Sequence, residues 1–367
     1  MSSGPAGSSI EMRNDAHNEE DKDGILRIAI IGAGTIGLSF TGLHLSHPAN
    51  RDGGRTVEIR IYDPRPELRA YVERMLPAYL SPSPAAGSLQ APSSSSSDSK
   101  VTDRIALPPP ISSHTLILSP TLADAVSTAH IIQEQGPESI STKQSLWSEI
   151  ESLAPPSALF WSSTSGIPAS VQSQAMRNPK RLLVVHPYNP PHIMPLLELV
   201  PAPGTDLDGS GSDVQRTLAY WRRLGRDPVV LKEEVSGFVA NRLAFALLRE
   251  GVELVNRGVA TPQEIDRVVE QSMGPRWAVR GPFWSYHAGG GEGGLKGILG
   301  NIGDTIQRCW DDAGKPDLKS EGRESEWVGR LCEAVDSSYG KLGKEDLKDR
   351  DDKTKRVLDI TRGGTTS

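Results

Sequence analysis

The residues with the clearest chemical potential are a histidine, an amide and a carboxylate that lie close together in the sequence. His186 opens the segment His-Pro-Tyr-Asn-Pro-Pro, which contains Asn189, and Glu198 follows twelve residues after the histidine. A neutral imidazole near pH 7 can accept a hydroxyl proton. A carboxylate at its other ring nitrogen would fix the tautomer and stabilise the imidazolium. Because a histidine near a proline-rich turn is more often structural, these residues alone indicate only a candidate proton-transfer site.

A glycine turn of the dinucleotide-binding type lies well upstream. Its sequence is Gly-Ala-Gly-Thr-Ile-Gly, and its cofactor-binding positions are Gly32, Gly34, Thr35, Ile36 and Gly37. The turn follows an apolar run and opens a helix whose free N–H groups would face the phosphates. Asp63, at the end of the next predicted strand, would accept hydrogen bonds from ribose hydroxyls and repel a 2′-phosphate. The turn therefore predicts NAD rather than NADP, although Arg65 could accommodate a phosphate.

Strand and helix signals alternate along most of the chain and indicate how these residues would be positioned. Apolar strand-like runs are expected at 25–31, 57–62, 115–118, 131–132, 158–161, 182–185, 196–200 and 229–231. Helical segments are expected between them at 36–45, 122–128, 142–153 and 213–224. Such alternation predicts an α/β fold with a Rossmann-like, doubly wound, mostly parallel sheet. His186 would then lie at the carboxyl edge of the sheet, where ligands of such folds bind.

A change in apolar spacing marks a second domain. From about residue 234 the apolar residues recur at roughly helical intervals, and Thr261-Pro262 has the residue types of a helix start. We therefore expect an NAD-binding domain at 25–233 and an all-helical substrate domain at 234–340. The charged tail at 341–367 is expected to be a solvated helix face or a frayed end.

Two segments have compositions that do not favour a packed core. Residues 1–24 are rich in Ser, Gly, Asp, Glu and Asn and are expected to form a disordered tail. Residues 80–113 contain five consecutive serines and three consecutive prolines. Because so few apolar side chains cannot offset the entropy of ordering, we expect a solvated loop inserted into the first domain.

Composition excludes several classes of function. The 367 residues carry a formal net charge of −6, which argues against a nucleic-acid surface. No apolar run approaches membrane-spanning length. Cys309 and Cys332 are far apart and lack metal-ligand spacing, so neither a metal site nor a disulfide framework is expected. The N-terminus lacks an apolar signal region and is too acidic for a mitochondrial presequence, so the expected location is the cytoplasm.

Five ordered motifs over roughly residues 25–294 resemble the 3-hydroxyacyl-CoA dehydrogenase superfamily. Besides the glycine turn and Glu198, they are Ser163-Thr-Ser165, His186-Pro-Tyr-Asn-Pro-Pro and Gly237-Phe-Val-Ala-Asn241-Arg. Residues 186–201 and the segment Gly-Pro-Arg276-Trp-Ala through Gly-Pro-Phe283 resemble more closely the lambda-crystallin and L-gulonate 3-dehydrogenase branch, with its relative L-carnitine dehydrogenase.

The resemblance implies a role for each matching position. Ser165 would hydrogen-bond the 3-oxygen of the substrate, His186 would be the general base and Glu198 would orient it. Asn189 and Asn241 would border the substrate and the nicotinamide, in a site that lies in the cleft between the two domains. Simpler interpretations remain, because Ser165 could cap a turn and Asn241 could cap the helix that follows.

Two further positions are implied as NAD contacts. Glu138 and Lys143 match the segment that follows a strand end and flanks the cofactor in the family. Lys143 could instead be a surface lysine. The resemblance also implies a homodimer formed through the helical domain.

Arg276 is the candidate receptor for a substrate carboxylate, because a guanidinium can bind a carboxylate through two hydrogen bonds. It could instead form an ion pair at a domain interface. With Arg276, we expect a small free hydroxy acid, similar to L-gulonate or L-carnitine, rather than a CoA thioester. The neighbouring aromatic residues could enclose a quaternary ammonium, although such residues more often form core or dimer contacts: Trp277, Phe283, Trp284 and Tyr286.

Two alternatives stay open, and the sequence argues against a third. The chain could act on a CoA thioester, or it could be a non-catalytic NAD-binding protein of the crystallin type. A β-hydroxyacid dehydrogenase would need a catalytic lysine in its helical domain. No lysine occurs between Gly237 and Gly294, which argues against that class.

Overall fold

The structure, a computed structural model, describes residues 24–47, 50, 56–80, 103–318 and 326–362. The chain forms two units, Met1–Val239 and Ala240–Ser367. The predicted disordered tail falls almost entirely outside the described residues, and so does most of the serine-rich insertion. Those two expectations therefore stay predictions over 1–23 and 81–102.

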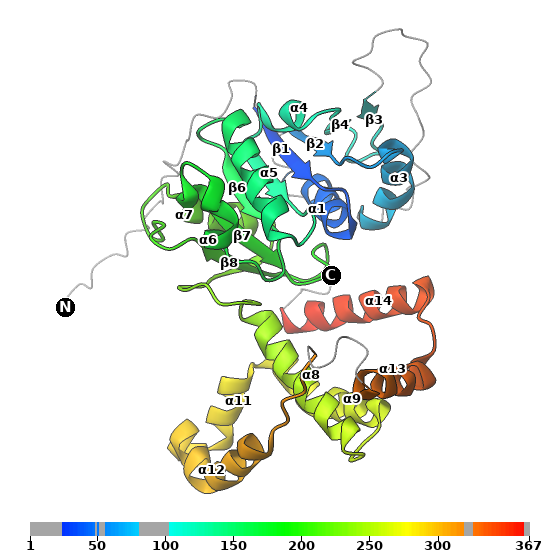
Figure 1. Ribbon diagram of the computed structural model, residues 1–367, viewed down its shortest axis with the longest axis vertical. Helices are drawn as coiled ribbons and strands as arrows, with labels where there is room; N and C mark the ends of the chain where they lie inside the picture. The colour runs from blue at the N-terminus through cyan, green and yellow to red at the C-terminus, as the bar shows by residue number, and fades with distance from the viewer. Residues whose placement is uncertain (1–23, 48–49, 51–55, 81–102, 319–325, 363–367) are drawn as a thin grey trace, which may run out of the picture. The chain divides into compact units, whose positions relative to one another are not determined.

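The first unit is built on one sheet, which Figure 1 shows with helices packed against it. Within the described residues, the sheet has nine strands in the order β3-β4-β2-β1-β5-β6-β7-β8-β9. In chain order the strands are β1 (Ile25–Ile31), β2 (Thr56–Tyr62), β3 (Arg104–Ile105), β4 (Thr115–Leu118), β5 (Ile131–Glu134), β6 (Leu159–Ser162), β7 (Leu182–Pro187), β8 (Leu196–Pro201) and β9 (Asp227–Val230).

Most neighbouring strands of this sheet are parallel. β1 lies between β2 and β5 and pairs in parallel with both. Among the described strands, only β3–β4 and β7–β8 are antiparallel neighbours. The order β4-β2-β1-β5-β6-β7 is that of dinucleotide-binding folds, and its direction reverses between β1 and β5, where such folds bind their ligands. The predicted doubly wound, mostly parallel sheet is therefore confirmed.

Helices cover both faces of the sheet, and two buried apolar clusters show which helices lie on each face. One cluster joins side chains of α1, α3 and α7 to strand residues such as Ile28 and Ile59. The other joins α4, α5 and α6 to Ala29 and Ile132. Neighbouring strand residues thus point to opposite faces, as the pleat requires. These helices are α1 (Thr35–Ser46), α3 (Leu68–Met75), α4 (Leu122–Val126), α5 (Ile140–Leu153), α6 (Ala169–Gln172) and α7 (Asp213–Arg223).

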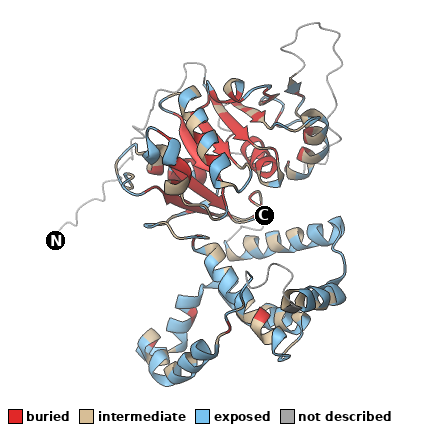
Figure 2. Cartoon of the chain, viewed as in Figure 1, coloured by how far each residue is buried: buried red, intermediate tan, exposed pale blue. Residues whose placement is uncertain are grey.

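The second unit is helical throughout its described residues apart from connecting turns, which confirms the predicted helical C-terminal region. The helix start that was predicted at Thr261-Pro262 is observed at the beginning of α9. There Thr261 and Glu264 form a reciprocal capping box. Figure 2 shows few buried residues in this unit. Its helices are α8 (Ala240–Asn256), α9 (Pro262–Gln271), α10 (Met273–Val279), α11 (Pro282–Gly289), α12 (Gly294–Asp312), α13 (Glu326–Tyr339) and α14 (Lys344–Thr361).

The boundary between the units lies later than predicted. We expected the NAD-binding domain to end at residue 233, whereas the first unit extends to Val239. Residues beyond 233 stay with the sheet unit because Glu234 Oε1 accepts a hydrogen bond of 2.8 Å from Ser170 N. In addition, Phe238 is fully buried in one of the two core clusters.

The interpretation of residues 80–113 as one solvated loop is wrong at its ends. In the described part, Arg104–Ile105 forms β3 at the edge of the sheet. Leu80, Ile105 and Ile111 are buried and belong to the core. These few apolar side chains are enough to attach both ends of the segment to the core. In the charged tail, most of 341–367 forms α14, a helix with no buried residue, as expected for a solvated helix face.

Two findings bear on partners of the described part of the chain. None of its helices combines the length and the apolar character needed to cross a membrane. Over the same residues, no group of three or more His, Cys, Asp or Glu side chains could hold a metal ion.

Candidate active site

The glycine turn joins β1 to α1 in a tight backbone arrangement. Gly32 has a φ of +100°, which favours glycine, and a Cβ on Gly37 would lie 2.0 Å from Gly32 O. At Gly34, by contrast, a Cβ would meet no protein atom within 4 Å. Gly34 is the N-cap of α1 and has no side chain to cap it, and Thr35 and Ile36 form the first helical turn. The N–H groups of this turn can therefore bind an anionic group such as a phosphate.

Asp63 lies directly after β2 and connects the glycine turn to Arg65. Its Oδ2 accepts hydrogen bonds from Ala33 N at 2.7 Å and from Arg65 Nη2 at 3.0 Å. Its Oδ1 accepts one from Arg65 Nε at 2.8 Å, and the guanidinium lies 4.0 Å from the Tyr71 ring centroid. Burial opposes the ionisation of Asp63, but the hydrogen bonds from Arg65 and Ala33 outweigh it and lower the pKa of Asp63. Arg65 is thus held by a carboxylate and an aromatic ring.

Lys143, predicted as a cofactor contact, is turned inward to a buried carboxylate. Its Nζ lies 2.8 Å and 2.9 Å from the two oxygens of Glu134, and neither side chain is more than 1% exposed. Glu134 also accepts hydrogen bonds from Ser162 Oγ at 3.0 Å and from Gly136 N at 2.6 Å. Since its positive charge is already paired, Lys143 is not the surface lysine that was considered. Its two hydrogen bonds instead connect α5, which contains Lys143, to the end of β5, which contains Glu134.

Glu138 contacts the loop that follows β6. Its Oε2 accepts a hydrogen bond from Thr164 Oγ1 at 2.7 Å, and its Oε1 accepts one from Ser165 N at 2.5 Å. Both Glu138 and Ser165 are exposed. Glu138, predicted as a cofactor contact, and Ser165, predicted as a substrate contact, are therefore neighbours.

His186 and Glu198 form a buried hydrogen-bonded pair. His186 Nδ1 lies 2.8 Å from Glu198 Oε2, and the side chains are 6% and 3% exposed. A carboxylate only accepts hydrogen bonds, so Nδ1 carries the hydrogen and Nε2 carries the lone pair. An imidazole in this state can accept a proton at Nε2, and the carboxylate can stabilise the resulting charge. Asn189 lies two residues beyond the end of β7 and is exposed.

The segment immediately before α8 also reaches this pair. Val239 N donates a hydrogen bond of 2.8 Å to Glu198 Oε1, the second carboxylate oxygen. The ring centroids of Phe238 and His186 lie 5.2 Å apart. Sequence reasoning quoted this segment but assigned no role to Phe238 or to the Val239 amide. It likewise assigned no role to Glu134, although an acidic residue at the end of a buried strand was a usable signal.

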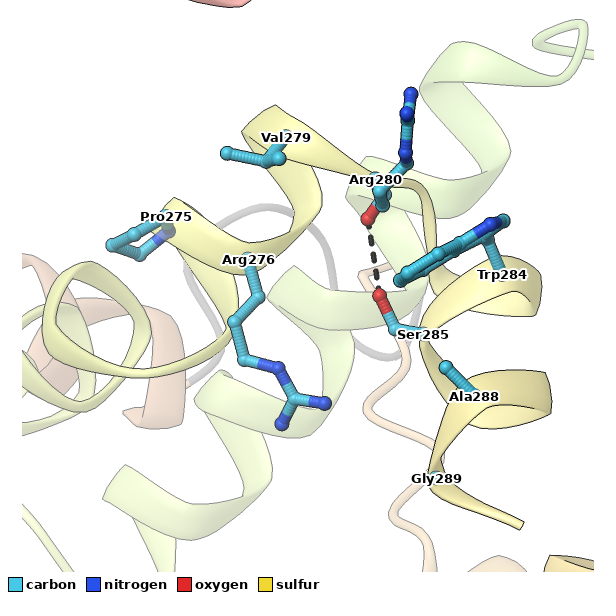
Figure 3. Close-up of a pocket in the computed structure, with 8 residues that line it drawn as sticks. All are labelled: Pro275, Arg276, Val279, Arg280, Trp284, Ser285, Ala288 and Gly289. Carbon is cyan, nitrogen blue, oxygen red and sulfur yellow. Dashed lines mark hydrogen bonds between the residues drawn. The ribbon is translucent and has the colours of Figure 1, made fainter. Parts of the chain in front are cut away.

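Asn241 and Arg276 belong to the second unit. Asn241 is the second residue of α8, and Arg276 is an exposed residue of α10. Arg276 lines a hollow of about 610 Å³ together with Trp284 and Ser285 of α11. In Figure 3 its side chain extends into the space beside α10 and α11, and the dashed line marks the hydrogen bond from Ser285 Oγ to Arg280 O. A guanidinium placed in this way can receive a carboxylate.

The residues of the first unit fit a dinucleotide. The topology brings the glycine turn, Glu138, Ser165 and His186 to the carboxyl ends of the adjacent strands β1, β5, β6 and β7. At Gly34, no protein atom occupies the space that a Cβ would enter, and the helix start beside it suits a pyrophosphate. When bound, NAD would supply the acceptor for a hydride at this edge of the sheet.

Comparisons with known proteins agree with this geometry. The model of the 3-hydroxyacyl-CoA dehydrogenase NAD-binding domain matches residues 27–234, and the model of the C-terminal domain of that family matches 237–328. The L-carnitine dehydrogenase of Streptomyces coelicolor is 31% identical over 82% of this chain and 84% of its own length. The L-carnitine dehydrogenase of Oceanobacillus iheyensis is 31% identical over 87% of this chain and 94% of its own.

Two further comparisons broaden the picture. A 3-hydroxyacyl-CoA dehydrogenase of Gibberella moniliformis is 36% identical over 63% of this chain and 70% of its own. Among solved structures, 5-formyl-3-hydroxy-2-methylpyridine 4-carboxylic acid 5-dehydrogenase, an NAD+ dependent dismutase, superposes with a TM-score of 0.66 at 27% identity. That alignment covers 92% of this chain and 99% of the other.

Together with the Rossmann-like unit, its glycine turn and the helical unit, these matches identify an NAD-dependent dehydrogenase that acts on a CH–OH group. The matched ranges extend over both units. The chain belongs to the 3-hydroxyacyl-CoA dehydrogenase family, as the motifs predicted.

Proposed function

We propose that the substrate is a small L-3-hydroxy acid bound as a free carboxylate, similar to L-carnitine or L-gulonate, and that His186 takes the hydroxyl proton. The observation that carries the role of His186 as the base is its 2.8 Å hydrogen bond to Glu198. This pair lies at the carboxyl edge of the sheet that also carries the glycine turn. The edge is where open α/β folds bind their ligands.

Glu198 determines which ring nitrogen of His186 accepts the proton. With the hydrogen on Nδ1, the Nε2 lone pair of His186 accepts the proton of the 3-hydroxyl group. Glu198 stabilises the imidazolium that forms and keeps the ring in one orientation. General-base catalysis of this kind contributes about 10²- to 10⁴-fold to a rate.

In this proposal, three other polar residues orient the substrate. Ser165 hydrogen-bonds the 3-oxygen, and Asn189 and Asn241 border the substrate and the nicotinamide. The contact of Glu138 with the Ser165 amide supports the first assignment, because it holds that loop in place. In this proposal Glu138 therefore helps to orient the substrate through Ser165, whether or not it also contacts NAD.

The proposed cofactor contacts divide by the part of NAD that they hold. The glycine-turn residues bind the pyrophosphate through backbone N–H groups, and Asp63 binds the ribose hydroxyls of adenosine. Lys143 is the weakest assignment, because Glu134 already neutralises its charge. We retain its contact with NAD as a prediction that mutation can test.

Arg276 is the proposed carboxylate receptor. A guanidinium can bind a carboxylate through two parallel hydrogen bonds, and Arg276 borders a hollow on the surface of its own unit. Relatives that are named L-carnitine dehydrogenase, a name that indicates a free acid, support this choice. A quaternary ammonium group would also find an aromatic partner in Trp284, which lines the same hollow.

The substrate class is tested by following NADH formation with purified protein. L-Carnitine and L-gulonate are compared with 3-hydroxybutyryl-CoA, each at the same concentration and with excess NAD. Turnover of at least one free acid is expected, and Arg276→Gln should raise its KM more than it lowers kcat. Arg267→Gln, at an exposed arginine of α9 that does not line this hollow, serves as the matched control. Turnover of the thioester alone would contradict the free-acid proposal.

A CoA thioester is the second candidate, because one relative is named 3-hydroxyacyl-CoA dehydrogenase and is 36% identical over 63% of this chain. The thioester arm of the same assay decides between the two. Absence of turnover with every substrate, together with NADH binding, would instead favour a non-catalytic protein of the lambda-crystallin type.

We also propose a homodimer formed through the helical unit, in the cytoplasm. Large apolar side chains there are strongly exposed, including Leu243 at 64%, Phe283 at 81% and Trp310 at 68%. Apolar exposure of this extent indicates a surface that another protein covers. Light scattering of the purified chain should give twice the monomer mass. A monomer at micromolar concentration would contradict the dimer, and fractionation of the source cells tests the location.

A further inference from the structure

The two residues before α8, Phe238 and Val239, contact the two members of the proposed catalytic pair. Val239 N donates its hydrogen bond to Glu198 Oε1, while Oε2 bonds to His186 Nδ1. The Phe238 ring lies against the imidazole at an interplanar angle of 51°. One short segment therefore touches the carboxylate and the ring that it orients.

Phe238 occupies this place in an uncommon backbone conformation. Its φ is +53°, in the left-handed region that few residues other than glycine adopt, and it follows Gly237 with a φ of +75°. The turn is closed by a hydrogen bond of 3.0 Å from Phe238 N to Val235 O. Such conformations persist where the surroundings hold them, and they are concentrated at functional sites.

We propose that Phe238 and the backbone amide of Val239 are positioning elements for the His186–Glu198 pair. The amide engages Oε1 and opposes rotation of the carboxylate, so that Oε2 stays at Nδ1. The Phe238 ring limits the tilt of the imidazole, so that Nε2 keeps one direction. This inference rests on the proposed role of His186 as the base.

The amide of Val239 is tested with Glu198→Gln. The N–H group needs an acceptor, so the carboxamide oxygen should face Val239 and the NH₂ group should face His186 Nδ1. Nδ1 then becomes the acceptor, and the hydrogen moves to Nε2. ¹⁵N spectra of histidine-labelled, ligand-free protein distinguish the two tautomers, with His186 assigned by its absence in His186→Gln. Retention of the Nδ1–H tautomer would contradict the role of the amide.

The Phe238 ring is tested with Phe238→Leu, which keeps a buried apolar side chain and removes the ring. We expect kcat to fall about 10- to 100-fold, the size of effect that a displacement of about 1 Å can produce. The KM for the hydroxy acid and the affinity for NADH should be unchanged. In ligand-free protein, the His186 Nδ1–H should exchange faster with water. If this variant does not fold, Phe238→Met is used, because a flexible thioether fills irregular space.

Phe160→Leu is the matched control. Phe160 is fully buried in the same core cluster, and its ring contacts Trp147 and the Arg181 guanidinium, not His186. It should lose stability to a similar extent while kcat and the His186 spectrum stay unchanged. An unchanged kcat in Phe238→Leu, or an equal loss in Phe160→Leu, would overturn the proposal. Retained turnover in His186→Gln would instead refute the proposed function, and the ligand-free spectra separate the two failures.

Discussion

His186 and Glu198 are directly opposite each other in the antiparallel ladder between β7 and β8. Opposite residues in such a ladder project from the same face, so the 2.8 Å contact follows from strand register. A register shift of one residue would turn one of the two side chains to the other face. The orientation of the proposed base is therefore set by the register of the sheet.

The glycine turn allows folding and cofactor binding to be tested separately. Gly34→Ala should fold with unchanged stability, because its Cβ meets no protein atom within 4 Å. It should lower NADH affinity by more than about tenfold, or about 1.4 kcal/mol, because the Cβ enters the space proposed for the pyrophosphate. Fluorescence titration with NADH and urea unfolding measure the two effects.

Gly37→Ala is the companion variant. Its Cβ would lie 2.0 Å from Gly32 O, so this variant should lose about 1–3 kcal/mol of unfolding free energy. Equal NADH affinity in Gly34→Ala and in the unmodified protein would refute the proposed location of the pyrophosphate.

The pairing of Asp63 with Arg65 predicts how the coenzyme preference can be changed. Asp63→Ser removes the carboxylate that would repel a 2′-phosphate. It also releases the Arg65 guanidinium, which in the unmodified protein donates hydrogen bonds to both oxygens of Asp63. NADH should bind more weakly and NADPH more tightly, and isothermal titration measures both. In the double variant Asp63→Ser/Arg65→Ser the gain for NADPH should become smaller, because only the loss of the carboxylate repulsion remains. An equal gain in the single and double variants would show that Arg65 does not bind the phosphate.

The buried pair of Lys143 and Glu134 predicts a large effect on stability. Lys143→Met leaves a buried carboxylate without its cation, which should cost about 3–5 kcal/mol in urea unfolding. Adding Glu134→Gln removes the unpaired charge and should restore part of the loss. Unchanged stability with a loss of NADH affinity would show instead that Lys143 is a direct contact of NAD.

His44 predicts how stability depends on pH. It is fully buried between Gln133 Oε1 at 3.0 Å and Tyr220 OH at 2.7 Å. Burial lowers its pKa from 6.5 to about 4, and the hydrogen bond to Gln133 opposes the shift only in part. Between these values the unfolded chain binds more protons, so the free energy of unfolding falls as the pH falls from 6.5 towards 4. The full effect is about 3 kcal/mol.

His44→Gln provides the control for this pH dependence. A glutamine does not titrate, so the loss of stability between pH 6.5 and pH 4 should become smaller by that contribution. Urea unfolding at several pH values measures the slope for both proteins. The same slope in both would mean that His44 is not the group responsible.

The sequence predicts most of the first unit because its strands are continuous apolar runs bounded by turns. Ile25–Ile31 and Thr115–Leu118 are observed with the predicted bounds. The edge strand β3 was missed because Arg104–Ile105 is too short to show alternation. The helical unit was predicted as a class but not in its packing, since most of its residues are exposed and its apolar spacing does not reveal a partner.

The candidate site was predictable where residue type determines chemistry, as with His186 and Glu198. The site was not predictable where backbone groups or the backbone conformation position the side chains. The residue types of Phe238 and Val239 do not indicate that Phe238 adopts a left-handed conformation or that the Val239 amide reaches Glu198 Oε1. Glu134 differs, because its position at the end of a buried strand was a usable signal. Its hydrogen-bond partners Gly136, Lys143 and Ser162, however, are brought together only in the fold.

The measurement that tests the central claim most directly is the turnover of His186→Gln with the best hydroxy acid from the substrate panel. Glutamine keeps a polar side chain on β7 but cannot take a proton at neutral pH. NADH should bind with unchanged affinity, whereas kcat should fall by about 10²- to 10⁴-fold, the contribution of a general base. Turnover close to that of the unmodified protein, with NADH still bound, would contradict the assignment of His186 as the base.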